Sequence, residues 1–428
     1  MQITKHRLAA ITAADAFLAG FAAALLLGHT GVIESLFFGL ALVLWCLPFI
    51  SGRRTPSTRS RVALGAGLFV LFAARMAALP VVSPDCQDYL LPWARTMSTM
   101  TFKEVMLGRV GDYTVLYQYF VFLLSRLPEG VDLVALYKLL SISFEALLAY
   151  SAASLACLAR GEETDSPCFS AVFLAALALP TIFLNGAYWS QCDAAFTSLA
   201  LFGVLMILKN RPHAGCACLA LSLCLKLQAV FILPVCALLL FHKKLTIRHA
   251  LTAAGTVSLV SIPALLAGKG IKGVLGVYLY QMGEYKQLVL DAPTLYQLLP
   301  ETASSKLGIL LAGGAMCVIL AIGALHKKPT SKLFIDIGFA LCLAIPFFLP
   351  HMHERYFYLA DVLSVCYAAA HPRRAYTPII VVLASLNGYC AYLFSAPLMG
   401  WTLPTLAVLL LLAATLALLV RDTAKESA

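Results

Sequence analysis

Acidic side chains in this sequence gather in short polar stretches that interrupt long apolar runs. The first stretch, 83–93, carries Asp85 and Asp88 directly after an apolar segment. A carboxylate held where one helix ends and the next begins suits a general base, because a hydroxyl that attacks a carbon must lose its proton. The structural alternative is a helix start, with Asp85 as the N-cap and Asp88 in the first turn. The residue pattern alone leaves both interpretations open.

The side chains that follow these acids predict a helix lying along a membrane surface. Aromatic and sulfur-containing residues recur there at helical spacing: Tyr89, Trp93, Met97 and Met100. That spacing puts them on one face of a helix. We expect this face to contact lipid, as in interfacial amphipathic helices.

Two further polar stretches, 185–193 and 226–228, lie at other boundaries between apolar runs. They contain Trp189, Gln191, Asp193, Lys226 and Gln228. Asp193 either contributes to a polar site or caps the helix that follows it. Lys226 lies among apolar residues, where a charge needs a partner such as a lipid phosphate or has to reach the interface along its own alkyl chain.

The last polar stretch opens a helix after a proline-containing segment. Its residues are His351, His353, Glu354, Arg355 and Tyr356. The pair His353-Glu354 could begin the zinc-binding motif HExxH, but Phe357 stands where the second histidine is required, so that motif is excluded. A helix N-terminus attracts anions and an arginine suits phosphate, so these side chains are candidates for binding a phosphorylated ligand.

Composition identifies the elements that position these residues as membrane helices. Of the 428 residues, 61% are hydrophobic and 12% are charged, whereas about a quarter of a typical soluble chain is charged. The mean hydropathy is +0.87. Because a helix satisfies its own backbone in lipid, we expect an all-α polytopic membrane protein of about 13 to 15 apolar helices. The net charge of +10 lies in short loops, a pattern typical of cytoplasmic loops and not of nucleic-acid binding.

Basic loops alternate with polar-aromatic loops along the chain, which assigns the two kinds of loop to opposite sides of a membrane. Three apolar segments lie between the outer loops 83–113 and 185–193, where alternation requires an even number of crossings. We therefore expect segment 114–127 not to cross fully. The short pair 213–225 and 226–241 predicts a hairpin of incomplete depth, which is tolerated where it lines a cavity.

Taken in order, these stretches resemble bacterial membrane proteins related to the GPI-anchor mannosyltransferases, within the GT-C superfamily. The resemblance covers about residues 62 to 400 and rests on Ser83-x-Asp85 through Pro92-Trp93, Gly111-Asp112-Tyr113 through Tyr117, Asn185 through Asp193, Lys226-Leu227-Gln228, Ala292-Pro293-x-Leu295-Tyr296, and Pro350 through Tyr356. It implies a GT-C-like bundle whose first large outer loop holds interfacial helices. It also implies a polyprenyl-phosphate-sugar donor and transfer with inversion.

The resemblance implies roles for individual residues as well. Asp85 matches the general base, and Asp88 is the second choice. Lys226 would meet the donor phosphate. The other candidates would shape the substrate site: Trp189, Gln191, Asp193, Gln228, His351, His353, Glu354, Arg355 and Tyr356. Cys86 departs from the pattern, which more often has an aromatic residue at that position.

The expected protein is thus a membrane glycosyltransferase that moves mannose or a similar hexose to a glycan, lipid or protein acceptor at the outer face of the cell membrane. A lipid phosphate is already a good leaving group and the outer loops contain no DxD sequence, so we expect neither a metal ion nor another cofactor. The expected organisation is a helix pair with a basic loop at 1–61, a catalytic membrane domain at 62–400, and a last helix with its tail at 401–428.

A multi-pass transporter or lipid flippase is the alternative from another class. Transporters place charged residues in the middle of the membrane, often in repeated halves with broken helices. Here the acids cluster in outer loops and no repeat is visible, which favours the enzyme. A scaffold or sensor without chemistry is disfavoured by the clustering of polar side chains.

Overall fold

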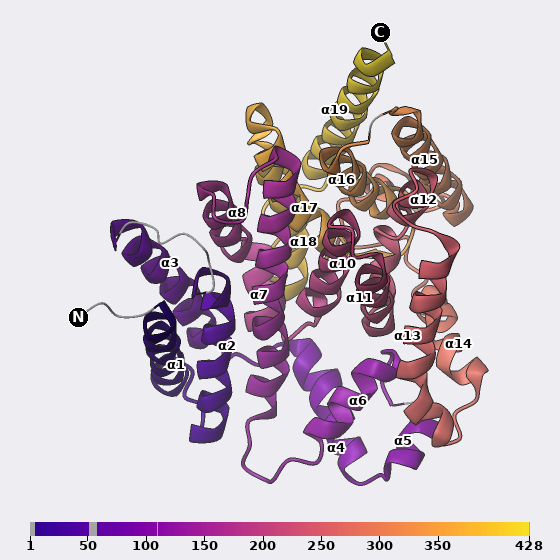
Figure 1. The fold of residues 1–428 in the computed structure, drawn as a ribbon. Helices are drawn as coiled ribbons and strands as arrows, with labels where there is room; N and C mark the ends of the chain where they lie inside the picture. The colour runs from indigo at the N-terminus through magenta and orange to yellow at the C-terminus, as the bar shows by residue number, and fades with distance from the viewer. Residues whose placement is uncertain (1–4, 51–57, 109, 328, 428) are drawn as a thin grey trace.

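The computed structural model describes residues 5–50, 58–108, 110–327 and 329–427, and these form a bundle of α-helices (Figure 1). The first part of the chain contains α1 (Lys5–Leu27), α2 (Val32–Ile50), α3 (Thr58–Ala77), α4 (Leu91–Ser98), α5 (Phe102–Leu107), α6 (Val115–Leu124), α7 (Leu133–Arg160), α8 (Pro167–Leu177), α9 (Pro180–Phe183) and α10 (Asp193–Leu208). The second part contains α11 (Pro212–Leu225), α12 (Val235–Phe241), α13 (Ile247–Leu266), α14 (Ile271–Gly283), α15 (Ser305–Leu325), α16 (Ser331–Phe348), α17 (Tyr358–Ala370), α18 (Thr377–Phe394) and α19 (Thr402–Ser427). Two short strands, β1 (Val289–Leu290) and β2 (Met352–His353), pair in parallel.

The helices confirm the prediction of an all-α polytopic membrane protein. Within the described residues, nine helices are long and apolar enough to cross a membrane: α1, α2, α3, α7, α13, α15, α16, α18 and α19. A further span is broken: α8 and the helix that begins with α9 pass the same test together and are bent by 51°. Four shorter apolar helices, α6, α10, α11 and α17, complete the set. Together they agree with the expected number of apolar helices.

The short helices explain where the alternation of loops fails. Helix α6 has 10 residues, about 15 Å of helix, whereas the hydrocarbon layer is about 30 Å thick. Helix α6 is therefore too short to cross that layer by itself, and the incomplete crossing of segment 114–127 stays a prediction that this length supports. Helices α11 and α12 have 14 and 7 residues and are separated by a 3-10 turn at Leu227–Phe231, so they too are short, as expected for a hairpin of incomplete depth.

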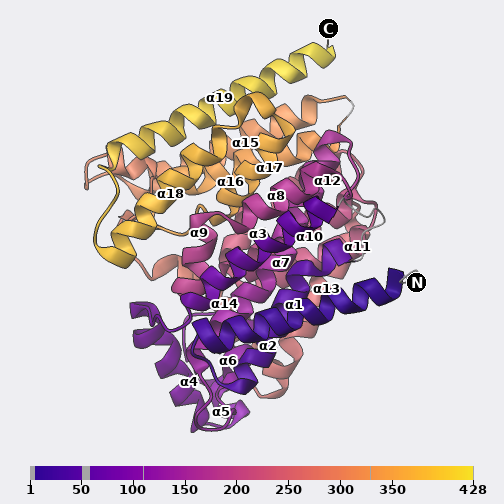
Figure 2. The ribbon, with the colours of Figure 1, turned by 90° about the vertical axis from the view of Figure 1, so that its left-hand side faces the viewer.

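The helices α4, α5 and α6 lie together at one end of the bundle, away from both chain termini (Figures 1 and 2). Helix α7 connects this end to the opposite one. Its first turn is capped by the Asp132 side chain, which accepts a hydrogen bond from the Ala135 backbone N–H, and it stops at Gly161 in the left-handed region (φ 69°). The Glu34 carboxylate accepts the Asp132 backbone N–H at 2.8 Å, which ties α2 to the start of α7.

A buried lysine on α7 fixes the chain just before Asp85. Lys138 Nζ donates to the carbonyl oxygens of Ala78, Leu79 and Val81 at 2.8, 3.1 and 2.6 Å. Carbonyl groups at a helix end lack partners within the helix, and a cation there is favourable. Helix α7 therefore sets the position at which α3 ends and the first polar stretch begins.

The prediction that one face of the 89–100 segment contacts lipid is wrong for Met97, and the Trp93 ring is partly covered. Tyr89 is 52% exposed, but Met97 is only 1% exposed. The Trp93 ring packs against Tyr113 with 5.8 Å between ring centroids, and a side chain at Gly111 would collide with that ring. Helix α6 and the residues before it pack against α4 and cover part of this face.

Candidate functional site

The Asp85 carboxylate is held by hydrogen bonds from two distant parts of the chain. Its Oδ2 accepts from Trp189 Nε1 and Gln191 Nε2, both at 2.9 Å. Its Oδ1 accepts from the hydroxyl of Tyr392, near the end of α18. The Ser83 hydroxyl also donates to the Trp189 carbonyl oxygen at 2.8 Å. The first polar stretch and the 185–193 stretch thus form one surface.

This arrangement excludes the interpretation of Asp85 as a helix cap. Asp85 has right-handed helical backbone angles, and its side chain makes no capping hydrogen bond to the π-helical turn Cys86–Leu90 that follows. Asp88 lies in that turn and is exposed. The structure therefore places the two candidate bases differently: Asp85 is oriented by three donors, and Asp88 faces outward. Burial raises the pKa of the neighbouring Cys86 thiol, which disfavours a thiolate nucleophile beside Asp85.

Asp193 is the centre of a second group of polar side chains. It is the first residue of α10, whose N-cap position is occupied by Cys192. Its Oδ1 lies 2.5 Å from Lys226 Nζ, and its Oδ2 accepts from Asn185 Nδ2 at 2.7 Å. Lys226 is 5% exposed at its side chain, so its partner is a carboxylate inside the protein and it does not reach the interface.

The third group comes from the 351–356 stretch and approaches Asp193 from the other side. Arg355 Nε lies 3.9 Å from Asp193 Oδ2, and the Arg355 guanidinium also pairs with Glu354. Its central carbon lies 5.0 Å from the centroid of the Trp189 ring. His353 Nδ1 lies 3.5 Å from Glu354 Oε2. One connected network therefore runs from Asp85 through Trp189 to Arg355 and His353.

Two of the predicted residues lie beside this network in supporting positions. The His351 ring nitrogen Nδ1 is 2.6 Å from the Gln287 carbonyl oxygen, next to the pairing of β1 with β2, so it attaches the 284–304 loop to the 351–356 stretch. The Tyr356 ring lies beside that of His353, with 5.1 Å between centroids and the ring planes tilted by 54°. Gln228 is 9% exposed in the turn after Lys226, and no contact joins its side chain to Asp85 or Asp193 in the described part of the structure.

Buried polar atoms without a hydrogen bond gather around the network. Among the residues that the structure describes, those near the site are Asn185 Oδ1, Gln228 Oε1, His353 Nε2, Glu354 Oε2 and Arg355 Nε. Burying such an atom unpaired costs about 1–3 kcal/mol. Donors and acceptors concentrated in this way are what a polar ligand would satisfy. In the same described ranges, no group of three or more His, Cys, Asp or Glu side chains is placed to hold a metal ion.

The charges of this network nearly cancel. Lys226 and Arg355 carry positive charge, while Asp193 and Glu354 carry negative charge next to them. Asp85 adds a further carboxylate near Trp189. The two cations are therefore already paired, and an anionic ligand would have to share them with Asp193 and Glu354.

Unusual backbone conformations coincide with the site. π-helical turns occur at Cys86–Leu90 and Leu184–Tyr188, directly beside Asp85 and Trp189, and such turns occur often at functional sites. Ser190, Asp291 and His351 have positive φ angles of 69°, 53° and 62°. Strained residues persist where the surrounding structure holds them, and they cluster at binding and catalytic sites.

We expect Gly388→Ala to damage this site through a steric clash. A Cβ at position 388 would lie 2.2 Å from the Asp291 carbonyl oxygen and 3.0 Å from Glu354 Cβ, so the backbone of the 284–304 loop would have to move. Overpacking of this kind costs about 1–3 kcal/mol, which should appear as a lower apparent Tm. Gly314→Ala is the control, because nothing lies within 4 Å of its added Cβ and the helix would gain propensity. Equal Tm values for the two variants would contradict the clash.

Glu354 should make stability depend on pH. Burial opposes its ionisation, but Arg355 and His353 outweigh burial and hold the pKa of this carboxyl below its ordinary value of 4.5. A depressed pKa adds stability above pH 4.5 that is lost as pH falls through the lower folded-state pKa. We expect Glu354→Gln to be less stable at pH 7 and to lose part of the decline in Tm below pH 4.5. Glu301→Gln, at an exposed position, is the matched control. If the Tm of Glu354→Gln declines below pH 4.5 as steeply as that of the wild type, the pKa of Glu354 is not depressed in the folded protein.

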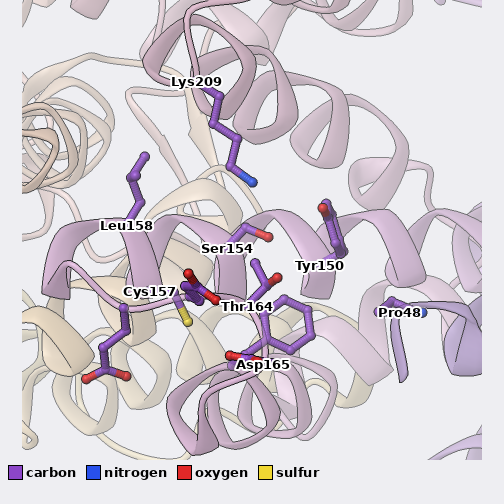
Figure 3. Close-up of a pocket in the computed structure, with 11 residues that line it drawn as sticks. Pro48, Tyr150, Ser154, Cys157, Leu158, Thr164, Asp165 and Lys209 are labelled. Atoms are coloured by element: carbon purple, nitrogen blue, oxygen red, sulfur yellow. The ribbon is translucent and has the colours of Figure 1, made fainter. Parts of the chain in front are cut away.

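A cavity of about 480 Å³ is lined by residues of α7, the loop that follows it and the end of α10, none of which belongs to this network (Figure 3). It is lined by Ser154 on α7, whereas Ser141 on the same helix donates to the Gln191 carbonyl oxygen. These serines are thirteen positions apart, which corresponds to about 20 Å of helix. The cavity therefore belongs to a separate part of the protein.

Several residues that complete the site were not among the sequence-based candidates. Tyr392 donates to Asp85, and Tyr389 contacts Asn185 with 3.1 Å between its hydroxyl and the amide nitrogen. The two tyrosines lie three residues apart in α18. This spacing puts them on one face of the helix and could have identified them as candidate site residues. Tyr113 donates to Gln191 Oε1 at 3.1 Å, and it lies in one of the motifs that carry the family resemblance.

No protein-family model matches this chain, and no curated protein matches its sequence. The class of the protein follows from its fold: it is an all-α, multi-pass membrane protein. Its function has to be inferred from the geometry of the site.

Proposed function

We propose that this protein is a glycosyltransferase that uses a polyprenyl-phosphate-linked sugar, with Asp85 as the general base. The observation that carries the proposal is the orientation of Asp85 by three hydrogen bonds, from Trp189, Gln191 and Tyr392. An ionised carboxylate has about four acceptor positions. Tyr392 alone occupies Oδ1, so that oxygen retains a position for the proton of an acceptor hydroxyl.

The proposed reaction is a single displacement at the anomeric carbon. The acceptor hydroxyl oxygen attacks that carbon, and Asp85 takes its proton. The bond between the anomeric carbon and the phosphate oxygen breaks, and the lipid phosphate leaves with the electron pair. Attack opposite to the leaving group inverts the configuration of the sugar. The sugar is mannose or a similar hexose, by the resemblance stated above.

Arg355 and His353 are suited to the departing phosphate. His353 is buried and Arg355 is half-buried, and each has a buried nitrogen, Nε2 in His353 and Nε in Arg355, without a hydrogen-bond partner among the described residues. Preorganised donors aimed at developing charge lower the barrier most in a dry site. Lys226 acts through Asp193: its ion pair with that carboxylate holds α10 against the turn after α11, which positions Asp193 against Arg355.

The distribution of loop charge supports an active site at the outer face of a cell membrane. Asp85, Asp193 and Glu354 all lie in loops that the positive-inside rule assigns outside, and the basic loops lie between other helix ends. A lipid-linked donor confined to the bilayer would reach Asp85 through the interfacial region near α4. The acceptor is a glycan, a lipid or a protein at that face.

A reconstituted assay tests the proposal. The purified protein in liposomes is given radiolabelled polyprenyl-phosphate-mannose and membrane acceptors, with polyprenyl-phosphate-glucose and a nucleotide-linked sugar in parallel. We expect label to move to an acceptor from a lipid-linked donor and not from the nucleotide sugar. Transfer from the nucleotide sugar alone, or movement of the lipid donor between leaflets with no transfer across the sugar panel, would replace the proposal with another class, the latter with a flippase.

A further inference from the structure

The carboxylate of Asp361, on α17, is completely buried. The residue is 0% exposed, and neither Oδ1 nor Oδ2 has a hydrogen-bond partner among the residues that the structure describes. No basic side chain in the described ranges forms an ion pair with it. Burying a charged group is costly unless the charge is paired. The Asp361 carboxylate therefore requires a compensating group.

The position of Asp361 in the first turn of α17 does not meet this requirement. A helix N-terminus favours a nearby negative charge, but the effect is small compared with the cost of burying an unpaired ion. Phe357 occupies the N-cap position, and its side chain makes no capping hydrogen bond. The helix end thus supplies no partner for either oxygen of Asp361.

Two buried hydroxyl groups lie beside this carboxylate. Thr181, on the helix that begins with α9, and Ser385, on α18, are both 0% exposed. Their side chains lie next to Asp361, yet neither hydroxyl is in hydrogen-bonding geometry with it or with another described atom. Helices α9, α17 and α18 pack against one another (Figure 2). Four buried oxygen atoms without partners therefore converge from three helices.

This group of oxygens lies one helical turn below the network around Asp193. Asn185 and Tyr389, which contact each other at 3.1 Å, follow Thr181 and Ser385 by four positions each. Both helices run toward the end of the bundle that holds Asp85, so the residue four positions earlier lies about 5.4 Å deeper on the same face. The oxygens are thus inside the bundle and separate from the proposed transferase site.

A break in a membrane span adjoins Thr181. The two helices of the span α8–α9 are bent by 51°, and Pro180 is the first residue of α9. Proline lacks a backbone N–H, and carbonyl groups at a helix end have no partner within the helix. In membrane transporters, the carbonyl groups of such interrupted helices coordinate sodium ions. The break can therefore supply further oxygen ligands close to Thr181.

The ligand atoms and their charge indicate the kind of ion. Carboxylate, hydroxyl and carbonyl oxygens suit hard cations and not the softer transition metals. The single carboxylate balances one positive charge, whereas a divalent ion would bring an uncompensated charge into apolar surroundings. The short side chains on three packed helices favour the smaller sodium ion over potassium.

We propose that Asp361, Thr181 and Ser385 bind a sodium ion. The ion compensates the buried carboxylate and gives the two hydroxyl oxygens a partner. It holds α9, α17 and α18 together beneath Asn185 and Tyr389. This role is structural and does not depend on the proposed transfer reaction.

Binding of radioactive sodium to the purified full-length protein in detergent tests the proposal, together with the apparent Tm in NaCl, KCl, CaCl₂ and choline chloride at equal ionic strength. We expect saturable sodium binding and a Tm that rises with sodium concentration, because an ion that binds only the folded state stabilises it. Choline chloride should give no rise. An equal rise in KCl would contradict the assignment to sodium, and a rise in CaCl₂ alone would contradict the single charge.

The variants Asp361→Asn and Ser385→Ala locate the ion. Asp361→Asn removes the charged ligand and should weaken sodium binding at least about tenfold, since ligand charge sets the affinity for hard cations. Ser385→Ala removes a neutral ligand and should weaken binding less, and it decides the question if Asp361→Asn does not fold. Ser151→Ala is the matched control, because this buried hydroxyl donates to the Leu147 carbonyl oxygen of its own helix. Its sodium binding should equal that of the wild type.

Two results overturn the proposal. The absence of saturable sodium binding by the wild type, with the same Tm in all four salts, would show that Asp361 holds a proton instead. Unchanged binding in both Asp361→Asn and Ser385→Ala would place the ion elsewhere. Helicity and size-exclusion profiles of each variant identify a folding defect separately.

Discussion

Asp85→Asn is expected to reduce sugar transfer by about 10²- to 10⁴-fold, the usual contribution of a positioned general base. Asparagine keeps the size of the side chain. Its oxygen can still accept from Trp189 and Gln191, and its amide can donate to the Tyr392 hydroxyl. The fold and the position of the side chain should therefore be retained while the ability to take a proton is lost. The loss is measured in the liposome assay as the initial rate at saturating donor.

Asp88→Asn is the matched control for this prediction, because the two acids lie three residues apart and Asp88 is exposed. We expect its rate to stay within about threefold of the wild type, since it removes no positioned base. A large loss in Asp88→Asn together with a normal rate in Asp85→Asn would exchange their roles. Normal rates in both variants would show that neither Asp85 nor Asp88 acts as the general base.

Breaking the buried ion pair between Arg75 and Glu145 is expected to be the most destabilising single change outside the site. Arg75 Nε lies 2.5 Å from Glu145 Oε2, and the side chains are 1% and 0% exposed. Arg75 also donates to the Leu177 carbonyl oxygen at 2.8 Å, where the bent span α8–α9 is interrupted. Removing one partner of a buried pair leaves an uncompensated charge and costs about 3–5 kcal/mol. Arg75→Met should therefore lower the apparent Tm sharply.

The double variant Arg75→Met/Glu145→Leu distinguishes an unpaired charge from lost packing. Replacing a whole buried pair with apolar residues is often close to neutral, so we expect it to recover much of the stability lost in Arg75→Met. The exposed pair Arg160–Glu162 is the control: its side chains are 35% and 30% exposed, and Glu162→Gln should change stability by less than about 1 kcal/mol. A double variant as unstable as the single one would show that the charge is not the cause.

Apolar runs and loop charge were enough to predict the bundle and its short segments. Hydropathy and loop charge can be read locally along the chain, and a count of crossings was enough to predict that 114–127 contains a helix too short to span by itself. The face of the helix after Asp85 could not be predicted in the same way. Periodicity placed Trp93 and Met97 on one helix face. It could not show that α6 would cover this face, because that depends on how α6 packs against α4 in the folded protein.

The sequence also could not predict which residues pair with the charged side chains. The sequence indicated that the charge of Lys226 had to be compensated. Pairing with a lipid phosphate and exposure at the membrane interface were the two alternatives. The actual partner, Asp193, lies 33 positions earlier in the chain and was itself an alternative helix cap. A pattern identifies residues that need a partner, whereas pairing across a fold depends on the packing of α10 against α11. The order of motifs along the chain was the only sequence feature that grouped Asp85 with Arg355.

The hydrogen bond from Tyr392 to Asp85 has a consequence for biosynthesis. Asp85 is synthesised about 300 residues before Tyr392, the residue on α18 whose hydroxyl orients its Oδ1. A nascent or truncated polypeptide ending before α18 would contain the proposed base with that oxygen unrestrained. Under the proposed role of Asp85, competence for catalysis would then arise only after α18 has been inserted, which would protect a lipid-linked sugar from unproductive cleavage by partly synthesised protein.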